Sequence, residues 1–380
     1  MTMSDTSTPA KVRNSNLELY RIITMVLIVA HHYVVNSGLM STGGPIESDP
    51  LSFHSLFLLL FGAWGKVCIN CYVLITGYFM CEKNITLKKF LKLVCVVEFY
   101  QVLIFGIFCV TGFEELSLVS LIKALIPVRA ISDNFESVFI VFFLSIPFLN
   151  IVIRNMTERQ HLRLLALLTF SYIILGTLPG FFVTMNYLSW FMVLFFIASY
   201  LRLYPKRIFG DTESWRIATI VCIIISSVSV IAMTMLSARW HRDGLLSYYF
   251  VTDSNTLLAV LTGISSFMYF KNVDIPQSRL INTVGATTFG VLLIHANSDA
   301  MRQWLWVDTL NNVSTYYSPW GYIHAILSVA VVFVVCSFLD LLRIRLIEKP
   351  FFDALDKRLP QIVSWYEHIE SRLFEKLHVQ

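Results

Sequence analysis

Eight ionisable side chains lie inside long apolar runs of this sequence, where hydrocarbon surroundings make charge costly. They are Glu18, Arg21, His31, His32, Lys66, Glu98, His295 and Asp340. Such residues are candidates for function, because a charged group inside a membrane is usually paired with another group, faces a water-filled cavity or takes part in the protein's activity. The histidines suit proton transfer, since burial favours the neutral imidazole, which accepts a proton near neutral pH.

The first apolar run holds the densest set of these residues. Glu18 precedes Arg21 by three positions, a spacing at which the two side chains can pair on a helix surface. At about 100° per residue, Arg21 and His32 share one helix face about 16 Å apart, while His31 points about 100° away. The spacing predicts a polar stripe with Arg21 and His32 toward opposite ends of one helix. The alternatives are a snorkelling Arg21 and a hydrogen-bonded interior His32.

The composition excludes a water-soluble globular protein. Of the 380 residues, 56% are hydrophobic and 14% are charged, against about 25% charged residues in soluble domains. A net charge of +4 is far from the basic balance that nucleic-acid binding favours, so no nucleic-acid partner is expected. The 7 cysteines lie mostly within apolar runs and include one CxxC, Cys68 and Cys71, with no second pair. We therefore expect neither a disulfide framework nor a metal site.

The apolar runs predict an all-α, polytopic membrane protein with about ten transmembrane helices. Each run approaches the length of about 20 residues that crosses a bilayer as a helix, in which every backbone group is bonded internally. The expected spans are 17–36, 55–80, 90–111, 135–153, 163–183, 187–204, 216–236, 250–270, 282–301 and 320–346.

The distribution of positive charge predicts that both termini are cytoplasmic. With that orientation, most of the 29 Lys and Arg residues lie on the inner side. The outer segments hold only Lys123, Arg129, Arg239, Arg242 and Arg302. The chain then divides into a disordered cytoplasmic N-terminus (1–14), a membrane domain (15–350) and a cytoplasmic tail (351–380). The tail is either an amphipathic helix on the inner leaflet or a solvated helix.

Two motifs in the first half of the chain resemble the acyltransferase-3 family of membrane O-acyltransferases. Glu18-Leu-Tyr-Arg21, followed by ten residues and His32, resembles the first helix of that family. The segment 62–78, which contains Gly65 and ends in Thr76-Gly77-Tyr78, resembles its second-helix segment.

Two further motifs follow in the same order as in the family. Thr288-Phe-Gly-Val-Leu-Leu-Ile-His295 is similar to the late helix that ends in an Ile-His pair, and Ile347-Glu-Lys-Pro350 is similar to the closing Glu-Lys-Pro. The chain departs from the family at Lys66, where the second helix is usually apolar. A paired arginine motif of some members has no clean counterpart here, the nearest residues being Arg159 and Arg163.

The resemblance implies an O-acetyltransferase of the bacterial plasma (inner) membrane. It would move an acetyl group from cytoplasmic acetyl-CoA to a hydroxyl of a cell-surface or lipid-linked polysaccharide. The implied partners are acetyl-CoA, a carbohydrate or lipid-linked glycan acceptor, and the lipid bilayer. No metal is implied.

Acyl transfer from a thioester requires a base, donors for the developing oxyanion and a cavity that excludes water. We expect His32 to be the general base or the acceptor of a transient acyl group. Arg21 is predicted to contact CoA or to pair with Glu18. Glu98 is predicted to pair with Lys66, Arg21 or His32 or to stay protonated, and it is the second candidate for orienting the imidazole.

Three residues near the predicted outer surface are candidates for binding the acceptor: His295, Asn297 and Trp190. For His295 and Asn297, the alternative is a polar cap at the end of a helix. For Trp190, the alternative is an aromatic anchor at the membrane interface.

Two other classes of protein fit parts of the pattern. A secondary transporter or flippase for a lipid-linked sugar predicts Gly- or Pro-broken helices in corresponding positions of two halves. We find no such pairs in the sequence. A noncatalytic assembly or sensor protein predicts that Arg21 and His32 are dispensable.

Overall fold

The computed structural model describes residues 14–128, 134–181, 183, 185–240, 244–358, 369 and 372, and within them the secondary structure is helical, without strands. In the first half, the α-helices are α1 (Ser15–Val35), α2 (Pro45–Ser48), α3 (Phe53–Gly62), α4 (Gly65–Met80), α5 (Leu87–Val110), α6 (Leu118–Ala124), α7 (Phe135–Arg154) and α8 (Glu158–Leu168). A π-helix, η1 (Thr169–Ile174), leads from α8 into α9 (Leu175–Thr177).

The second half is also helical in its described residues. Its elements are α10 (Tyr187–Leu203), η2 (Arg207–Gly210), α11 (Thr212–Trp240), η3 (Gly244–Tyr248), α12 (Leu257–Asn272), α13 (Arg279–His295), α14 (Asp299–Arg302), η4 (Gln303–Thr309), α15 (Asn312–Tyr316), α16 (Gly321–Arg343), η5 (Ile344–Glu348) and α17 (Lys349–Asp356).

Each of the ten predicted spans overlaps a helix or consecutive helices, although the span predicted at 250–270 begins seven residues before α12. Within the described residues, 6 helices are long and apolar enough to cross a bilayer, and a 7th is added if α13 and the bent segment 299–309 form one span. That pair is bent by 95°, and α10 is apolar but shorter. The all-α, multi-pass membrane fold is therefore confirmed, whereas the number of crossings and the sides of the termini stay predictions.

The predicted terminal segments lie largely outside the part of the chain that the structure describes. Of the N-terminal segment 1–14, only residue 14 is described. Residues 351–358 of the tail complete α17 and its turn, and beyond them only residues 369 and 372 are described, both helical.

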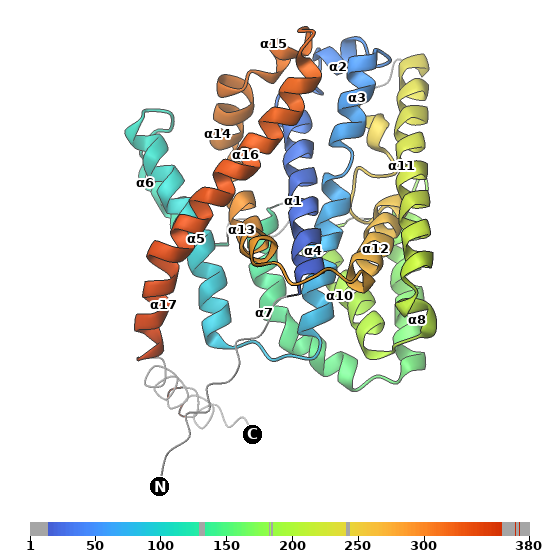
Figure 1. Ribbon diagram of the computed structural model, residues 1–380, viewed down its shortest axis with the longest axis vertical. Coiled ribbons are helices and arrows are strands. Elements are labelled where there is room, and N and C mark those ends of the chain that lie inside the picture. The colour runs from blue at the N-terminus through green and yellow to red at the C-terminus, as the bar shows by residue number, and fades with distance from the viewer. Residues whose placement is uncertain are drawn as a thin grey trace.

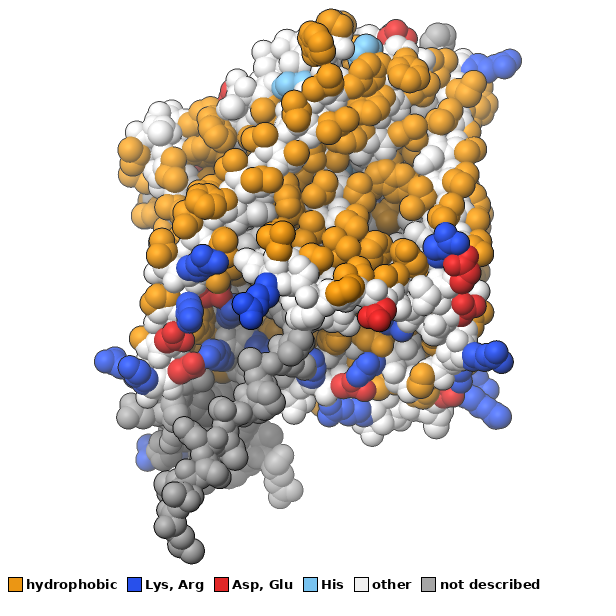
Figure 2. Space-filling view, viewed as in Figure 1, with side chains coloured by type: hydrophobic (Ala, Val, Ile, Leu, Met, Phe, Trp, Pro, Cys, Tyr) orange, Lys and Arg blue, Asp and Glu red, His pale blue; other side chains and the backbone are white. Residues whose placement is uncertain are grey.

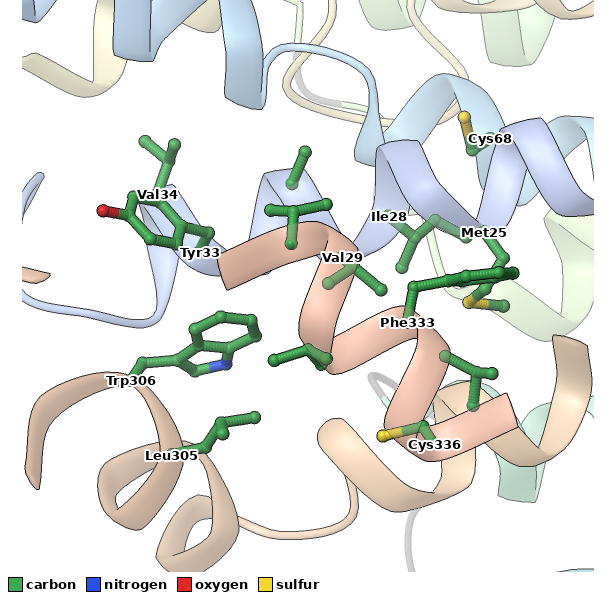
Figure 3. Close-up of a cluster of buried hydrophobic side chains, with 14 of the residues drawn as sticks. Met25, Ile28, Val29, Tyr33, Val34, Cys68, Leu305, Trp306, Phe333 and Cys336 are labelled. Atoms are coloured by element: carbon green, nitrogen blue, oxygen red, sulfur yellow. The ribbon is translucent and has the colours of Figure 1, made fainter. Parts of the chain in front are cut away.

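The first helix occupies the middle of the bundle. α1 packs against α3, α4, α13 and α16, so its side chains face neighbours from both halves of the chain (Figure 1). Figure 3 shows Phe333 of α16 beside Met25 and Ile28 of α1, with Cys336 farther from α1. The polar residues of α1 are thereby held among buried apolar side chains.

Charged side chains gather at one end of the bundle. In Figure 2 most Lys, Arg, Asp and Glu side chains lie over the lower part of the face shown, and apolar side chains cover most of the rest. α1 begins and α17 ends at this same end (Figure 1). We refer to it as the cytoplasmic end, in keeping with the predicted orientation.

A buried network of hydrogen bonds and ion pairs closes the bundle at this end and gives Asp340, which lies in an apolar run, its polar partners. Arg343 donates to Asp340 (2.7 Å) and to Glu348 (2.6 Å), and Tyr100 donates its hydroxyl to Asp340 at 2.8 Å. Glu348 belongs to the Glu-Lys-Pro motif and also pairs with Lys92. The motif therefore links α16 and η5 to α5.

Gly290 of α13 allows Asp340 to lie against the backbone of that helix. A Cβ atom at this glycine would be 2.1 Å from Cγ of Asp340, whose side chain is held by the buried network. We expect Gly290→Ala to lower the free energy of unfolding by about 1–3 kcal/mol, the usual cost of overpacking. Thermal unfolding in detergent measures it.

The matched control is Gly106→Ala on α5, where a Cβ atom meets nothing within 4 Å. That exchange should leave the unfolding temperature unchanged or raise it slightly, because alanine favours the helix. Equal melting temperatures for the two variants would contradict the packing assigned to Gly290.

Candidate active site

Two histidines that are far apart in the sequence meet between α1 and α13. Nδ1 of His32, in the last turn of α1, lies 3.0 Å from Nε2 of His295, the last residue of α13. Nδ1 of His295 lies 2.6 Å from the carbonyl oxygen of Val291, one turn earlier. The rings of Trp306 and His295 form a T-shaped pair, at 6.3 Å between centroids and 82° between planes.

These contacts fix where the protons of a neutral pair must be. The Val291 carbonyl can only accept, so Nδ1 of His295 carries the proton and its Nε2 is an acceptor. His32 must then donate from Nδ1, which leaves Nε2 of His32 unprotonated. The pair therefore presents one basic nitrogen, on His32.

A cavity of about 230 Å³ lies beside this pair. Its walls come from α1, α4, α7, α10, α13 and α14, and His32 is one of the lining residues. Met25, Ile28, Phe289 and Leu292 make part of the wall apolar. The volume is below the roughly 300 Å³ at which pockets for drug-sized ligands begin, so the cavity fits reacting groups rather than whole substrates.

Two cationic side chains also line the cavity. Lys66 Nζ lies 2.5 Å from the hydroxyl oxygen of Tyr187 and 5.2 Å from the centre of its ring. Arg302 reaches the cavity from α14 and pairs with Asp299 at 2.8 Å. The cavity thus combines an imidazole that can remove a proton from a hydroxyl with positive charge that can stabilise a developing oxyanion.

Tyr187 and Arg302 received no site role from sequence, and Lys66 was noted as an ionisable residue in an apolar run and as a departure from the family, without a role in the reaction. Tyr187 begins α10, directly after Asn186, whose side chain caps that helix by accepting from Ser189 N at 2.9 Å. An asparagine at the start of an apolar run is a sequence signal for a helix N-terminus, so the position of Tyr187 in the first turn could be predicted. Its contact with Lys66 of α4 could not, because residues 66 and 187 are separated by 121 positions.

His31 has a structural position next to the candidate base. Its Nδ1 lies 2.6 Å from the carbonyl oxygen of Gly62, and its ring rests on Gly65, where a Cβ atom would be 2.2 Å from Cγ of the ring. Only glycine permits this approach of α1 to α4. The contact fixes the rotation of α1 and hence the direction of His32.

Arg21 lies one turn nearer the cytoplasmic end than Met25, the first residue of α1 that lines the cavity. Arg21 donates from Nη1 to Glu18 Oε1 at 2.8 Å, as the spacing of the two residues predicted. Its side chain keeps a relative exposure of 29%, and its carbonyl accepts from the hydroxyl of Tyr72, a lining residue, at 2.9 Å. Contact of Arg21 with CoA stays a prediction.

His295, rather than Glu98, lies within hydrogen-bond distance of Nδ1 of His32, where Glu98 was predicted to orient the imidazole. Glu98 is half-buried on α5 and is not among the described residues that line the cavity, and its predicted pairing stays a prediction. A helix periodicity places residues on faces but does not say which faces of distant helices meet. The histidine pair joins residues separated by 263 positions, which the sequence alone did not reveal.

The acceptor-binding assignments also change. Trp190 is fully buried and donates from Nε1 to Asn70 Oδ1 at 2.9 Å, so it is a core residue rather than an acceptor contact or interface anchor. Asn297 donates to the carbonyl of Leu293 at 3.0 Å, which is the helix-end cap that was the alternative. His295 is completely buried against His32, so its geometry fits proton chemistry.

Within the described residues, no group of three or more His, Cys, Asp or Glu side chains is placed to hold a metal ion. An acyltransferase-domain family model matches residues 14–339. The chain belongs to the acyltransferase-3 family. No curated protein and no solved structure matches the chain.

The acyltransferase-3 match begins before α1 and ends within α16, so it covers both histidines and every element that lines the cavity. This acyltransferase is a multi-pass membrane protein.

Proposed function

We propose that this acyltransferase moves an acetyl group from cytoplasmic acetyl-CoA to a hydroxyl of a cell-surface or lipid-linked polysaccharide, in the plasma membrane of a bacterium. The observation that carries the proposal is the His32–His295 pair, which leaves Nε2 of His32 as a base at a small, partly apolar cavity. The family membership supports the acyl transfer itself.

In the proposed reaction, Nε2 of His32 takes the proton of the acceptor hydroxyl as its oxygen attacks the thioester carbonyl carbon. A C–O bond forms, and the carbonyl oxygen becomes an oxyanion. Collapse of this intermediate breaks the C–S bond, and the leaving thiolate takes the proton from His32 as general acid. The base is then regenerated, and no other reactant is consumed.

His295 and Lys66 stabilise different charges that develop during this reaction. His295 accepts the hydrogen bond from Nδ1 of His32, so it holds the imidazole in the required tautomer and stabilises the imidazolium that forms. Lys66 brings positive charge to the same cavity, where low polarity strengthens its attraction for an oxyanion. The apolar wall limits hydrolysis of the thioester by excluding water.

The depth of the residues fits donor and acceptor arriving from opposite sides. Arg21 lies toward the cytoplasmic end of α1 and is partly exposed, which suits an anionic group of CoA. His32 lies in the last turn of the same helix, toward the opposite end. We propose that the acyl group is delivered past Tyr72, which links Arg21 to the cavity.

A reconstituted assay tests this function. Purified protein in proteoliposomes receives acetyl-CoA labelled in the acetyl group, together with the glycan fraction of the host's envelope as acceptor. We expect label in the glycan that mild base releases as acetate, because an O-ester is base-labile. Movement of a lipid-linked sugar across the bilayer without labelled glycan would instead support a flippase.

A further inference from the structure

A second cavity of about 770 Å³ lies between α5, η4 and α16. It lies on the other side of α13 from the histidine cavity. Leu292 of α13 and Ala296, directly after that helix, line the histidine cavity, whereas Ile294, about 200° around the helix from Leu292, lines the second one. We call this second cavity the α5–α16 groove.

The α5–α16 groove is built for hydrocarbon. Aliphatic and aromatic side chains form nearly all of its described lining, and the one charged lining residue is Arg343. The guanidinium of Arg343 is already bonded to Asp340 and Glu348. A ligand with its own charge therefore gains nothing at that end, while an apolar chain buries surface along the whole length.

The length of the groove indicates which kind of hydrocarbon chain could fill it. Its lining on α16 and η5 extends from Val331 to Ile347, a rise of about 24 Å along the helix. One leaflet provides only about 15 Å, half of a hydrocarbon core of about 30 Å. A phospholipid chain confined to one leaflet is too short to fill the groove, and a long isoprenoid chain is not.

One end of the groove adjoins the histidine cavity through consecutive residues of α14 and η4. Met301 and Trp304 line the groove, and Arg302 between them lines the cavity. The Nε atom of Arg302 is buried and has no hydrogen-bond partner among the described residues. A polar head carried on a chain in the groove is thus brought toward a cation and the base.

We propose that the α5–α16 groove binds the hydrocarbon chain of a polyprenyl-phosphate-linked saccharide, and that Arg302 attracts its phosphate while the sugar hydroxyl reaches His32. The identity of this ligand as the acceptor rests on the proposed function. Binding of the chain in the groove favours the lipid-linked saccharide as acceptor over the free saccharide.

Neighbouring valines of α16 offer a matched pair of variants. Val335 lines the groove at 49% exposure, and Val334, at 62% exposure, is not among its described lining residues. Val335→Trp fills the groove, and Val334→Trp adds the same bulk outside it. Both positions are exposed to lipid, so neither variant disturbs the packed core.

Acetylation is measured with two acceptors, the polyprenyl-phosphate-linked saccharide and its water-soluble methyl glycoside. We expect Val335→Trp to lower kcat/KM for the lipid-linked acceptor at least tenfold and to leave the value for the glycoside unchanged. Val334→Trp should match the wild type with both. Equal effects on both acceptors, or no effect of Val335→Trp on either, would contradict the proposal that the groove binds the hydrocarbon chain of the acceptor.

Photo-crosslinking separates failure of the groove from failure of the proposed reaction. The probe is a polyprenyl phosphate with a diazirine in its last isoprene unit, and a diazirine phospholipid is the comparison. We expect the first probe to label α5 and α16 in the wild type and Val334→Trp but not in Val335→Trp. If both probes label the same peptides equally, the groove is ordinary lipid contact, whatever the protein catalyses.

Discussion

Acetyl transfer by the His32→Gln variant should be about 10³-fold slower than by the wild type. Glutamine keeps much of the size and polarity of the imidazole but has no basic nitrogen, so the acceptor hydroxyl would have to lose its proton to water. General-base catalysis typically contributes 10² to 10⁴ in rate. The rate of transfer from labelled acetyl-CoA to glycan in proteoliposomes, at equal amounts of folded protein, measures the effect.

The control for His32→Gln is the same exchange at His324. This histidine is on α16, bonds through Nδ1 to the hydroxyl of Tyr33 at 2.9 Å, and is not among the described residues that line the cavity. His324→Gln should keep activity within about threefold of the wild type. If His32→Gln retained more than a tenth of wild-type activity, Nε2 of His32 would not be the base.

The same variant pair addresses whether the acetyl group passes through the imidazole. Rapid quenching of wild-type protein with labelled acetyl-CoA, without acceptor, traps label on the chain only if Nε2 of His32 attacks the thioester itself. Label that is absent from His32→Gln and present in His324→Gln would identify the acyl-histidine route. Absence of label from all three proteins would indicate direct transfer to the hydroxyl.

The sequence predicted the local features of this protein well, because they depend on neighbouring residues. The long apolar runs gave the helical segments, and the spacing of three residues gave the ion pair of Glu18 with Arg21. Burial of a charged group in an apolar run also identified His32, His295 and Lys66 before any contact was known. These are consequences of helix geometry and of the cost of charge in lipid.

The sequence did not predict which distant faces meet. Trp190 at a helix start is equally consistent with the membrane interface and with the core, and only Asn70, 120 positions earlier, decides for the core. Glu98 satisfied the chemical requirement for an orienting group, but the rotation of α13 places His295 there instead. Packing between helices is decided by the fit of many side chains, which one-dimensional spacing does not record.

Removal of the orienting group in His295→Leu should slow acetyl transfer by about 10² to 10⁴, the upper value being that of a triad whose imidazole is held in the wrong tautomer. Leucine cannot accept from Nδ1 of His32, so neither the tautomer nor the imidazolium is supported. The loss should fall on kcat, with KM changed less than threefold, because His295 is buried behind His32 and is not among the described residues that line the cavity.

His295→Gln distinguishes this role from simple packing. Its carboxamide oxygen can accept the same hydrogen bond from Nδ1 of His32, so we expect kcat of His295→Gln to be at least tenfold higher than kcat of His295→Leu. A histidine that served only to fill space against Trp306 would instead be replaced better by leucine, since glutamine leaves buried polar atoms without the Val291 partner. Steady-state kinetics of the two variants, with their melting temperatures as the measure of packing, therefore decide whether the two imidazoles act as a pair.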